Sequence, residues 1–361
     1  MKAAVCREFG KPLSIEQVTL ADPNHGEVQV RIKACAICHS DINYAEGAWG
    51  GTLPAVYGHE AAGVVESVGQ GVDHAKPGDH VVVTLVRSCG TCGCCEQGFY
   101  GSCESSFPLD QQTPLHSEED DSEIVHGLRT GAFAEQVVVD ASQVVAIPKD
   151  IPMDSASLLA CGVITGWGAV VNTARIRAGT TTVVIGTGGV GLNSVQGAAM
   201  SGAKSIIAVD LSDSKLDAAT QFGATHTVNP TREDTAEAIG NLTNGRGADY
   251  VFVTVGAKQA FDQSYQLIAK GGVVVLVGMA GVDVTTEFNP LDLADSSQRI
   301  VGSKMGSSNI QRDIPSLIAL YRQGRLKLDE LITDRYPLEQ INEAIAAVNN
   351  GEALRNVIVF D

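Results

Sequence analysis

Four closely spaced cysteines are the sequence feature that most constrains how this chain can fold. Cys89, Cys92 and Cys95 are separated by two residues each, and Cys103 follows in the same stretch. Thiols at this spacing can point to one centre, which suits a tetrahedral Zn²⁺ ion with Zn–S distances of about 2.3 Å. Disulfides are the alternative, but such close neighbours bridge poorly, and Cys94 is left over inside the cluster. The spacing therefore predicts a structural zinc site.

Composition and charge narrow the classes of function. The 361 residues are enough for two domains. A formal net charge of −17 argues against nucleic-acid binding, because neutralising phosphates requires a basic face. No apolar run approaches the ~20 residues of a membrane span, and Met1 leads into a strand pattern rather than a signal peptide. The nine cysteines are expected to lie in a reducing cytoplasm. The charge and the lack of a long apolar run predict no nucleic-acid or membrane partner.

The N-terminal part of the chain has the pattern of short β-strands. Residues 27–33 alternate between apolar and polar side chains, and further strands are predicted at 64–68, 80–83, 133–139 and 144–147. The acidic run from Glu118 to Asp121 is typical of an exposed loop. We expect a small β-barrel-like domain with its metal sites on loops.

After residue 155 the pattern changes to alternating strands and helices. Apolar runs predict strands at 181–185, 205–210, 250–255, 272–277 and 299–301, as in a parallel sheet covered by helices on both faces. Helices at 314–322 and 338–349 and a strand at 356–360 complete the chain. The fold class is therefore α/β, with a doubly wound parallel sheet beside the β-barrel-type domain.

A glycine-rich loop lies between the first of these strands and a predicted helix at 192–200. Its Gly-x-Gly-x-x-Gly pattern places Gly186 at a tight turn, Gly188 where backbone approaches a pyrophosphate, and Gly191 where helix and strand pack closely. A helix N-terminus also offers free N–H groups to phosphates. The residues expected to contact a dinucleotide here are Gly186, Gly188, Gly189, Val190 and Gly191.

An acidic residue ends the second strand of this part. Asp210 can accept from the adenosine ribose hydroxyls and repels a 2′-phosphate, which favours NAD over NADP. Lys215, one helical turn later, could also reach the ribose edge. The alternative is a glycine-rich turn that binds nothing.

A second group of metal-ligand residue types is scattered along the chain. Cys38 and Asp41 follow a predicted strand, His59 and Glu60 follow a turn, and Cys161 lies near the junction of the two parts. Each has an alternative interpretation, Cys161 as a small buried hydrophobic residue and His59 as a core histidine. Sequence spacing alone does not unite them.

Taken with the cysteine cluster and the glycine loop, these residues resemble those of the medium-chain, zinc-dependent alcohol dehydrogenases. The resemblance extends from Met1 to beyond Arg355, with the motifs in family order. It implies a GroES-like catalytic domain formed by residues 1–152 and 303–361, with a structural zinc lobe at 88–104. Residues 153–302 would form a Rossmann NAD-binding domain.

The resemblance also assigns roles to the scattered residues. It implies that Cys38, His59 and Cys161 bind a catalytic zinc, with Glu60 as a further or transient ligand and Asp41 orienting the His59 ring. Each subunit would then hold two zinc ions. Three protein ligands leave one position where an alcohol can bind and lose its proton, so that a hydride passes to NAD.

Further contacts are implied by matching positions. Ser40 corresponds to the hydroxyl that accepts the substrate proton. The cofactor would contact His39, Thr165, Val255, Val277 and Arg355, and the substrate pocket would include Trp49, Leu85, Phe107, Pro108 and Lys304. This lining is largely apolar and favours an alkyl or aromatic alcohol over a sugar.

Several positions depart from the family pattern. Asn43 stands where a histidine commonly ends the proton relay, and His39 where an arginine commonly grips the pyrophosphate. The overall loop pattern resembles that of the class III branch of the family. Members of that branch hold glutathione through charged side chains, at positions that are here Gly47, Trp49 and Phe107, which argues against that substrate. Lys304 lies near an expected apolar position, so it either recruits an anionic substrate group or extends to solvent.

Three alternatives to an alcohol dehydrogenase are kept. Two are an S-hydroxymethyl-thiol (formaldehyde) dehydrogenase and a polyol dehydrogenase of the same family, although polyol enzymes commonly have glutamate in place of Cys161. The third is a nucleotide-binding protein that has lost its chemistry. From the resemblance, we expect a homodimer or, second, a homotetramer acting on a small alcohol or aldehyde.

Overall fold

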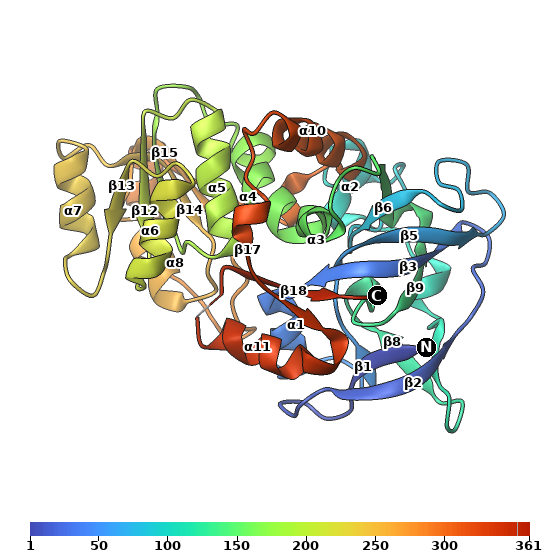
Figure 1. Ribbon diagram of the computed structural model, residues 1–361. Coiled ribbons are helices and arrows are strands. Elements are labelled where there is room, and N and C mark those ends of the chain that lie inside the picture. Colours follow the sequence, from blue (N-terminus) through green and yellow to red (C-terminus); the bar gives the residue numbers. More distant parts are fainter. Residues whose placement is uncertain (352) are drawn as a thin grey trace. The chain divides into compact units, whose positions relative to one another are not determined.

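The computed structural model describes residues 1–351 and 353–361, which form two compact units (Figure 1). The first unit comprises Met1–Gly162 and Asn309–Asp361, and the second comprises Val163–Ser308. The first therefore contains both ends of the chain, and the second is inserted between them.

The first unit is built from two β-structures. A closed barrel has the strand order β1-β2-β7-β8-β4, and a larger sheet runs β10-β6-β5-β3-β18-β17, with β9 also paired to β3. Their bounds are β1 Lys2–Cys6, β2 Ser14–Leu20, β3 Glu27–Ala36, β4 Ala55–Val56, β5 Glu60–Val68, β6 His80–Val83, β7 Leu115–Ser117, β8 Glu123–His126, β9 Gln136–Asp140, β10 Val144–Ile147, β17 Ile332–Pro337 and β18 Arg355–Val359.

Strand β3 organises the core of this unit. Its alternation buries Val28, Val30 and Ile32 in one apolar cluster, as expected for a strand with one face turned inward. Antiparallel pairing of β18 with β3 joins the C-terminal segment to the N-terminal sheet. Strand β17, whose sequence has no clear alternation, was not expected; it is held by parallel pairing with β18.

The second unit contains the predicted parallel sheet, and the α/β fold class is confirmed. The strand order is β13-β12-β11-β14-β15-β16, and all these pairs are parallel. Helices α5 and α6 contact β12, and α8 contacts β14 and β15 (Figure 1). The strands are β11 Thr181–Ile185, β12 Ser205–Val209, β13 His226–Val228, β14 Ala248–Val253, β15 Ile268–Leu276 and β16 Arg299–Gly302.

The helices connect and cover these strands. In the first unit they are α1 His39–Ala45, α2 Gly93–Glu96, α3 Met153–Leu158, α10 Ile310–Arg322 and α11 Ile341–Asn349. In the second they are α4 Ile164–Gly168, α5 Gly189–Met200, α6 Asp213–Gln221, α7 Thr235–Leu242, α8 Lys258–Ser264 and α9 Pro290–Asp295.

The two units divide at other positions than the expected 152/153 and 302/303. Helix α3 contacts β3 and β5, so the chain as far as Gly162 belongs to the first unit. Residues 303–308 belong to the second unit, because Thr173 hydrogen-bonds to Ser303 and Ser307 over 2.8 and 2.9 Å. Sequence composition does not reveal such contacts.

Several predicted strands have different ends. β14 ends at Val253 and β15 at Leu276, so Val255 and Val277 follow their strands rather than ending them. In the same way, Asp210 lies just after β12. The acidic residues Glu118 to Asp121 form an exposed turn between β7 and β8, as expected.

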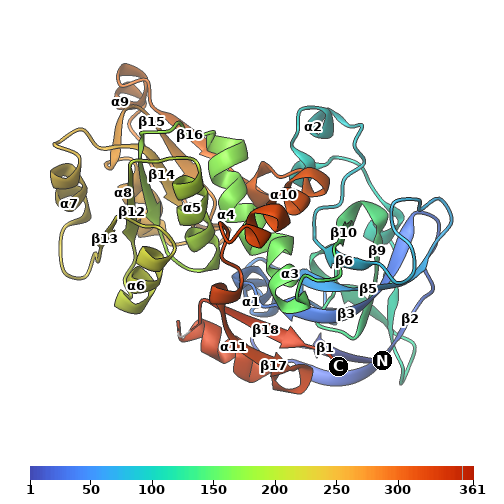
Figure 2. The ribbon, with the colours of Figure 1, turned by 45° about the horizontal axis from the view of Figure 1, so that its top comes forward.

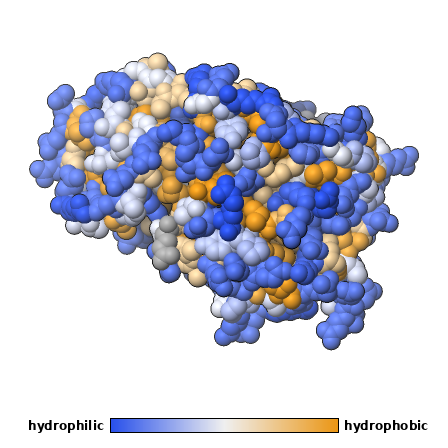
Figure 3. All heavy atoms as spheres, in the orientation of Figure 1, coloured by the Kyte–Doolittle hydropathy of each residue, from blue (hydrophilic) through white to orange (hydrophobic). Residues whose placement is uncertain are grey.

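One helical stretch, Met153–Ala174, is long and apolar enough to cross a membrane by composition alone. However, 83% of its most apolar window is buried inside the protein, which is typical of a core helix of a soluble protein. On the face drawn in Figure 3, hydrophilic residues predominate, and apolar residues form small groups among them.

Candidate functional site

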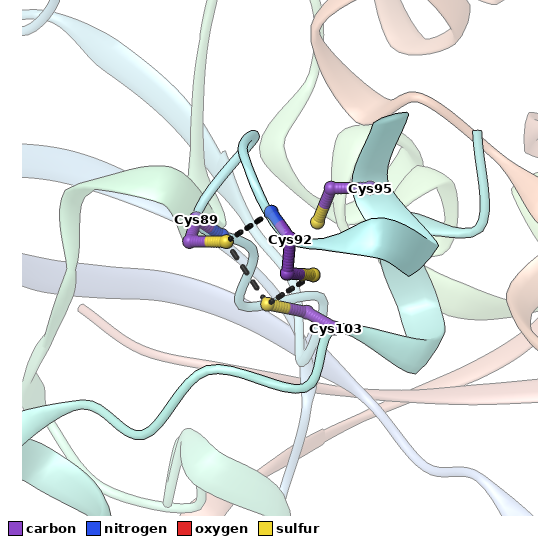
Figure 4. A group of neighbouring side chains, drawn as sticks. All are labelled: Cys89, Cys92, Cys95 and Cys103. Carbon is purple, nitrogen blue, oxygen red and sulfur yellow. Dashed lines mark hydrogen bonds between the residues drawn. The ribbon is translucent and has the colours of Figure 1, made fainter. Parts of the chain in front are cut away.

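The four clustered cysteines converge. Ligand atoms of Cys89, Cys92, Cys95 and Cys103 all lie within 4.8 Å of one another (Figure 4). Their sulfurs are free thiols rather than disulfides, with Sγ of Cys92 and Sγ of Cys103 3.8 Å apart. Cys94 is outside this group although it shares the short helix α2 with Cys95. The disulfide alternative is therefore not supported, and the donor set fits a tetrahedral zinc ion.

Backbone N–H groups point at these sulfurs. The N–H of Cys92 donates to Sγ of Cys89 over 3.2 Å, and the N–H of Cys89 donates to Sγ of Cys103 over 3.3 Å. Hydrogen bonds from Ser105 and Thr91 lower the pKa of the Cys89 thiol to about 5. Burial and the neighbouring Cys92 raise the pKa of Cys95 to about 12. Neighbouring thiols that share one centre shift one another's pKa in opposite directions, because one thiolate disfavours the ionisation of the next.

The scattered ligands also converge, within the first unit. Ligand atoms of Cys38, His59, Glu60 and Cys161 lie within 4.8 Å of one another, and all four residues are buried. Cys38 precedes α1, while His59 and Glu60 lie at the start of β5. Cys161 lies in a π-helical segment, Leu159–Val163, a rare geometry that is frequent at functional sites.

Asp41 fixes this arrangement. Its Oδ2 accepts from the N–H of Cys38 over 3.0 Å, and its Oδ1 accepts from the N–H of Gly58 over 2.9 Å. The same Oδ1 lies 2.8 Å from Nδ1 of His59. Because a carboxylate only accepts, Nδ1 carries a proton, and in the neutral imidazole, the form that binds a metal, Nε2 has the free lone pair.

That lone pair is the clearest sign of a metal. Nε2 of His59 is buried without any hydrogen-bond partner. A buried polar atom is normally satisfied, and this one faces the thiols of Cys38 and Cys161. Cys161 and the His59 ring both lower the pKa of the Cys38 thiol. The set of two sulfurs and one imidazole fits zinc.

The carboxylate of this group, Glu60, is paired with an arginine. Its Oε2 forms an ion pair with Arg355 and lies 3.4 Å from the N–H of Gly162, while its Oε1 is buried without a hydrogen-bond partner. Burial raises the pKa of Glu60 to about 7, against the opposing effect of Arg355. Arg355, only 6% exposed, thus contacts Glu60, a partner that sequence reasoning did not foresee. Its expected pyrophosphate contact stays a prediction.

The remaining expected residues of α1 lie beside this site. Ser40 is half-buried in the first turn, two residues after Cys38, and Asn43 is half-buried one turn later. His39, between Cys38 and Ser40, is exposed. Their positions agree with a relay and a cofactor contact, but their roles stay predictions.

The glycine loop has the geometry that its sequence predicts. Gly186 has φ +89°, and a Cβ on Gly191 would lie 1.8 Å from the carbonyl oxygen of Gly186. Gly188 has nothing within 4 Å of the position of a Cβ, so its exposed side is open to a ligand. Gly189 and Val190 begin helix α5.

Asp210 lies against this loop. Its Oδ2 accepts from the N–H of Thr187 over 2.7 Å, and its Oδ1 accepts from the N–H of Ser212 over 3.0 Å. Lys215 is half-buried in the first turn of α6. Thr165, Val255 and Val277 belong to the same unit, and Thr165 and Val277 are buried.

The residues predicted to line the substrate pocket belong to both units. Trp49, Leu85, Phe107 and Pro108 lie in the first unit, and Lys304 lies in the second and is exposed. Trp49 packs edge-on against Tyr44 with ring centroids 5.2 Å apart. Exposure of Lys304 fits the expectation that this side chain extends to solvent.

Sequence reasoning missed a buried polar cluster next to the zinc lobe. The side chains of Arg87 and Gln143 are completely buried and hydrogen-bonded to each other over 2.8 Å. An arginine directly after the largely apolar run 81–86 was the available signal. Its partners lie far away in the sequence and only the folded chain identifies them.

Comparison with known proteins identifies the family. The alcohol dehydrogenase GroES-like domain matches residues 24–149, and the zinc-binding dehydrogenase domain matches residues 189–323. The NDMA-dependent alcohol dehydrogenase of Amycolatopsis methanolica is 38% identical over 367 residues, covering 99% of this chain and 98% of that protein. The class-3 alcohol dehydrogenase of Cereibacter sphaeroides is 36% identical over 375 residues, covering 99% of each.

A solved structure supports the same family. Benzyl alcohol dehydrogenase from Acinetobacter calcoaceticus has a TM-score of 0.93 at 29% identity, covering 100% of this chain and 99% of that one. The chain therefore belongs to the medium-chain, zinc-dependent alcohol dehydrogenase family. It is an oxidoreductase that uses zinc, and the expected class of function is confirmed.

Proposed function

We propose that this protein is an NAD-dependent alcohol dehydrogenase with two zinc ions per subunit. The observation that carries the proposal is the unpartnered Nε2 of His59 beside the Cys38 and Cys161 thiols. When bound there, zinc supplies Lewis acidity that makes an alcohol hydroxyl more acidic, and NAD accepts the hydride. Cys38, His59 and Cys161 would hold the catalytic ion, and Cys89, Cys92, Cys95 and Cys103 the structural one.

The chain's own residues would bind and orient the reactants. Asp41 keeps the His59 ring in the tautomer that leaves Nε2 free. Ser40 would accept the alcohol proton at its Oγ and pass it on through the cofactor ribose. Asn43 cannot act as a base near neutral pH, so the proton would go from the ribose to water.

The relay is tested with Asn43→His. We expect the variant to change the pH profile of kcat, since it adds a base at the end of the relay. Asn349→His, the same substitution elsewhere in the chain, serves as the control. An unchanged profile for Asn43→His would count against a relay that lacks its terminal base.

The preference for NAD rests on Asp210. A carboxylate at the end of β12 favours ribose hydroxyls and disfavours a 2′-phosphate. NADH and NADPH binding, followed by fluorescence, should differ by about 100-fold or more in favour of NADH, and Asp210→Ser should reduce the difference. Turnover is also measured with NDMA, because a relative is named for its dependence on it. Equal affinity for both cofactors would overturn the NAD assignment.

The proposed substrate is an alkyl or aromatic alcohol. Trp49, Leu85 and Phe107 are apolar, and a benzyl alcohol dehydrogenase has nearly the same fold. The second candidate is a formaldehyde–thiol adduct, favoured by the class-3 relative. A panel of primary, secondary, aromatic and anionic alcohols, with S-hydroxymethyl-glutathione, decides between them. The adduct as the best substrate would overturn the first choice.

Assembly and location are proposed from the family resemblance. A homodimer formed edge to edge through the parallel sheets is the first expectation, and a homotetramer the second. Strand β16 lies at the end of the sheet order and, among the described strands, pairs only with β15 (Figure 2). Light scattering measures the mass, and Ile300→Pro in β16 should give monomers if this edge forms the interface. A cytoplasmic location stays a prediction.

A further inference from the structure

A buried arginine lies at the base of the zinc lobe. Arg87 follows strand β6 and precedes Cys89 by two residues, and its side chain is 0% exposed. Burying an unpaired guanidinium costs free energy, so a buried arginine needs partners. The partners of Arg87 identify the segments that it holds together.

Each edge of the guanidinium contacts a different segment. Nε donates to Oε1 of Gln143 over 2.8 Å, Nη1 donates to Oδ1 of Asp110 over 2.9 Å, and Nη2 donates to the carbonyl of Arg129 over 3.2 Å. The fork of arginine suits three partners in fixed directions, which lysine does not provide.

Gln143 completes the cluster. Its Nε2 donates to the carbonyl of Thr84 over 2.7 Å and to the carbonyl of Arg129 over 3.0 Å. Arg87 and Gln143 therefore share one acceptor, the Arg129 carbonyl, and Gln143 also fixes the backbone just before Leu85.

The first segment held in this way carries Phe107. The Arg87–Asp110 pair closes the loop that follows strand β6 of the larger sheet and contains the zinc lobe, residues 88–109. Asp110 also accepts from the N–H of Phe107 over 3.0 Å, and the guanidinium carbon lies 5.8 Å from the centre of the Phe107 ring. Phe107 is therefore oriented through both Asp110 and Arg87.

The second segment is a strained turn. Leu128 and Arg129 have φ +53° and +61°, a left-handed conformation that side chains other than glycine rarely adopt. Such strain persists where neighbouring contacts enforce it, and the shared donors to the Arg129 carbonyl are such contacts.

This turn leads to the metal ligand His59. The N–H groups of Ala132 and Phe133 donate to the carbonyls of Gly58 and Tyr57, each over 2.8 Å. A Cβ on Gly58 would lie 2.6 Å from the backbone nitrogen of Phe133, so the turn packs directly against the chain before His59.

We propose that Arg87 and Gln143 are positioning residues that set substrate specificity. They would do so by fixing residues 107–110, which include the predicted pocket residues Phe107 and Pro108, and the turn 127–131, which leads into the backbone paired with Gly58 next to His59. The inference rests on the proposed alcohol dehydrogenase function. It adds that the zinc lobe, the Phe107 segment and the turn at Leu128 and Arg129 share one buried anchor, so that the choice of alcohol would depend on residues outside the pocket.

The test compares Arg87→Lys and Gln143→Met with Arg31→Lys. Arg31 pairs with Glu66 on the surface, which makes it a matched control outside the site. We expect each anchor variant to change the ratio of kcat/KM for benzyl alcohol to that for ethanol by about 10-fold or more, chiefly through KM. The Arg31→Lys ratio should stay at the wild-type value. A uniform loss across the panel, or an unchanged ratio in folded variants, would overturn the proposal.

A second measurement separates this proposal from the proposed function. Hydrogen–deuterium exchange should become faster in peptides covering 107–110 and 127–131 in both anchor variants, and stay unchanged in the peptide covering β11 and α5. Unchanged exchange at the two segments would refute the anchor even if the enzyme is an alcohol dehydrogenase. Faster exchange in a protein that oxidises no alcohol would refute the proposed function and retain the anchor as a structural element. Should Arg87→Lys not fold, Gln143→Met gives both readouts.

Discussion

Nδ1 of His59 lies 2.8 Å from Oδ1 of Asp41, and both side chains are buried, 0% and 1% exposed. The pair decides which nitrogen of the imidazole can bind a metal. Asp41 also accepts from the backbone N–H groups of Cys38 and Gly58, so the same carboxylate holds the loop around the site.

Asp41→Asn should therefore weaken zinc binding at the catalytic site. The amide would turn an NH₂ group toward at least one of the three N–H donors, which leaves the His59 ring poorly oriented. We expect a loss of about 10- to 100-fold in zinc affinity, read from metal content after dialysis against a chelator series. Asp73→Asn, at a 99% exposed side chain, is the control. Wild-type affinity in Asp41→Asn would contradict the role of this pair.

The cysteine lobe offers a matched pair of substitutions. Cys95→Ser removes one of the four converging thiols and should lower the melting temperature by about 5–10 °C, with the loss of one zinc per subunit. Cys94→Ser changes the adjacent residue, which is outside the group, and should keep both zinc ions and the melting temperature. Equal effects of the two substitutions in calorimetry and metal analysis would argue against a zinc ion held by these four sulfurs.

Two glycines of the nucleotide loop should respond differently to alanine. Gly188→Ala places its Cβ in open space, so the fold should be retained while NADH binding weakens by about 10-fold or more. Gly191→Ala places its Cβ 1.8 Å from the Gly186 carbonyl oxygen and should lower the melting temperature itself. Fluorescence titration and thermal unfolding distinguish the two. Undiminished NADH binding by Gly188→Ala would mean that the cofactor does not approach this loop.

His126 should make stability depend on pH. Burial, followed by the charge of Arg87, lowers the pKa of His126 from 6.5 to about 4. Between these values the unfolded chain binds a proton that the folded protein does not, so stability falls as the pH decreases below 6.5. His126→Gln removes this contribution. The free energy of unfolding of wild type relative to that variant should fall by about 2 kcal/mol from pH 7.5 to pH 5.

Chemical denaturation at the two pH values measures this difference. His25→Gln, at an exposed position, should show no such change relative to wild type. A difference between wild type and His126→Gln that is the same at both pH values would show that His126 is protonated equally in both states.

His39→Arg should tighten cofactor binding. Histidine is only partly charged near pH 7 and lacks the fork that holds a pyrophosphate, whereas arginine supplies both. His39 is exposed beside Cys38, so the longer side chain can be accommodated. We expect the dissociation constant of NADH to fall by about 3- to 10-fold, together with slower product release in pre-steady-state kinetics. An unchanged dissociation constant would remove His39 from the cofactor contacts.

Local sequence patterns predicted many of the observed strands and helices. The alternation in 27–33, the apolar runs of the parallel sheet and the glycine loop all correspond to observed elements. Strand ends were less accurate, because the last residues of β14 and β15 depend on pairing with neighbours rather than on their own side chains. Strand β17 has no clear pattern and exists through its pairing with β18.

By itself, the sequence determined the features that depend on neighbours in the chain: the cysteine spacing, the Gly-x-Gly-x-x-Gly turn and the acid after β12. These are set by short-range geometry, which a few residues encode. Only the tertiary structure brought Cys38, His59 and Cys161 together, paired Glu60 with Arg355, and joined Arg87 to Gln143 and Arg129. Such contacts join residues far apart along the chain, and their geometry depends on how whole sheets and loops pack, which no local pattern specifies.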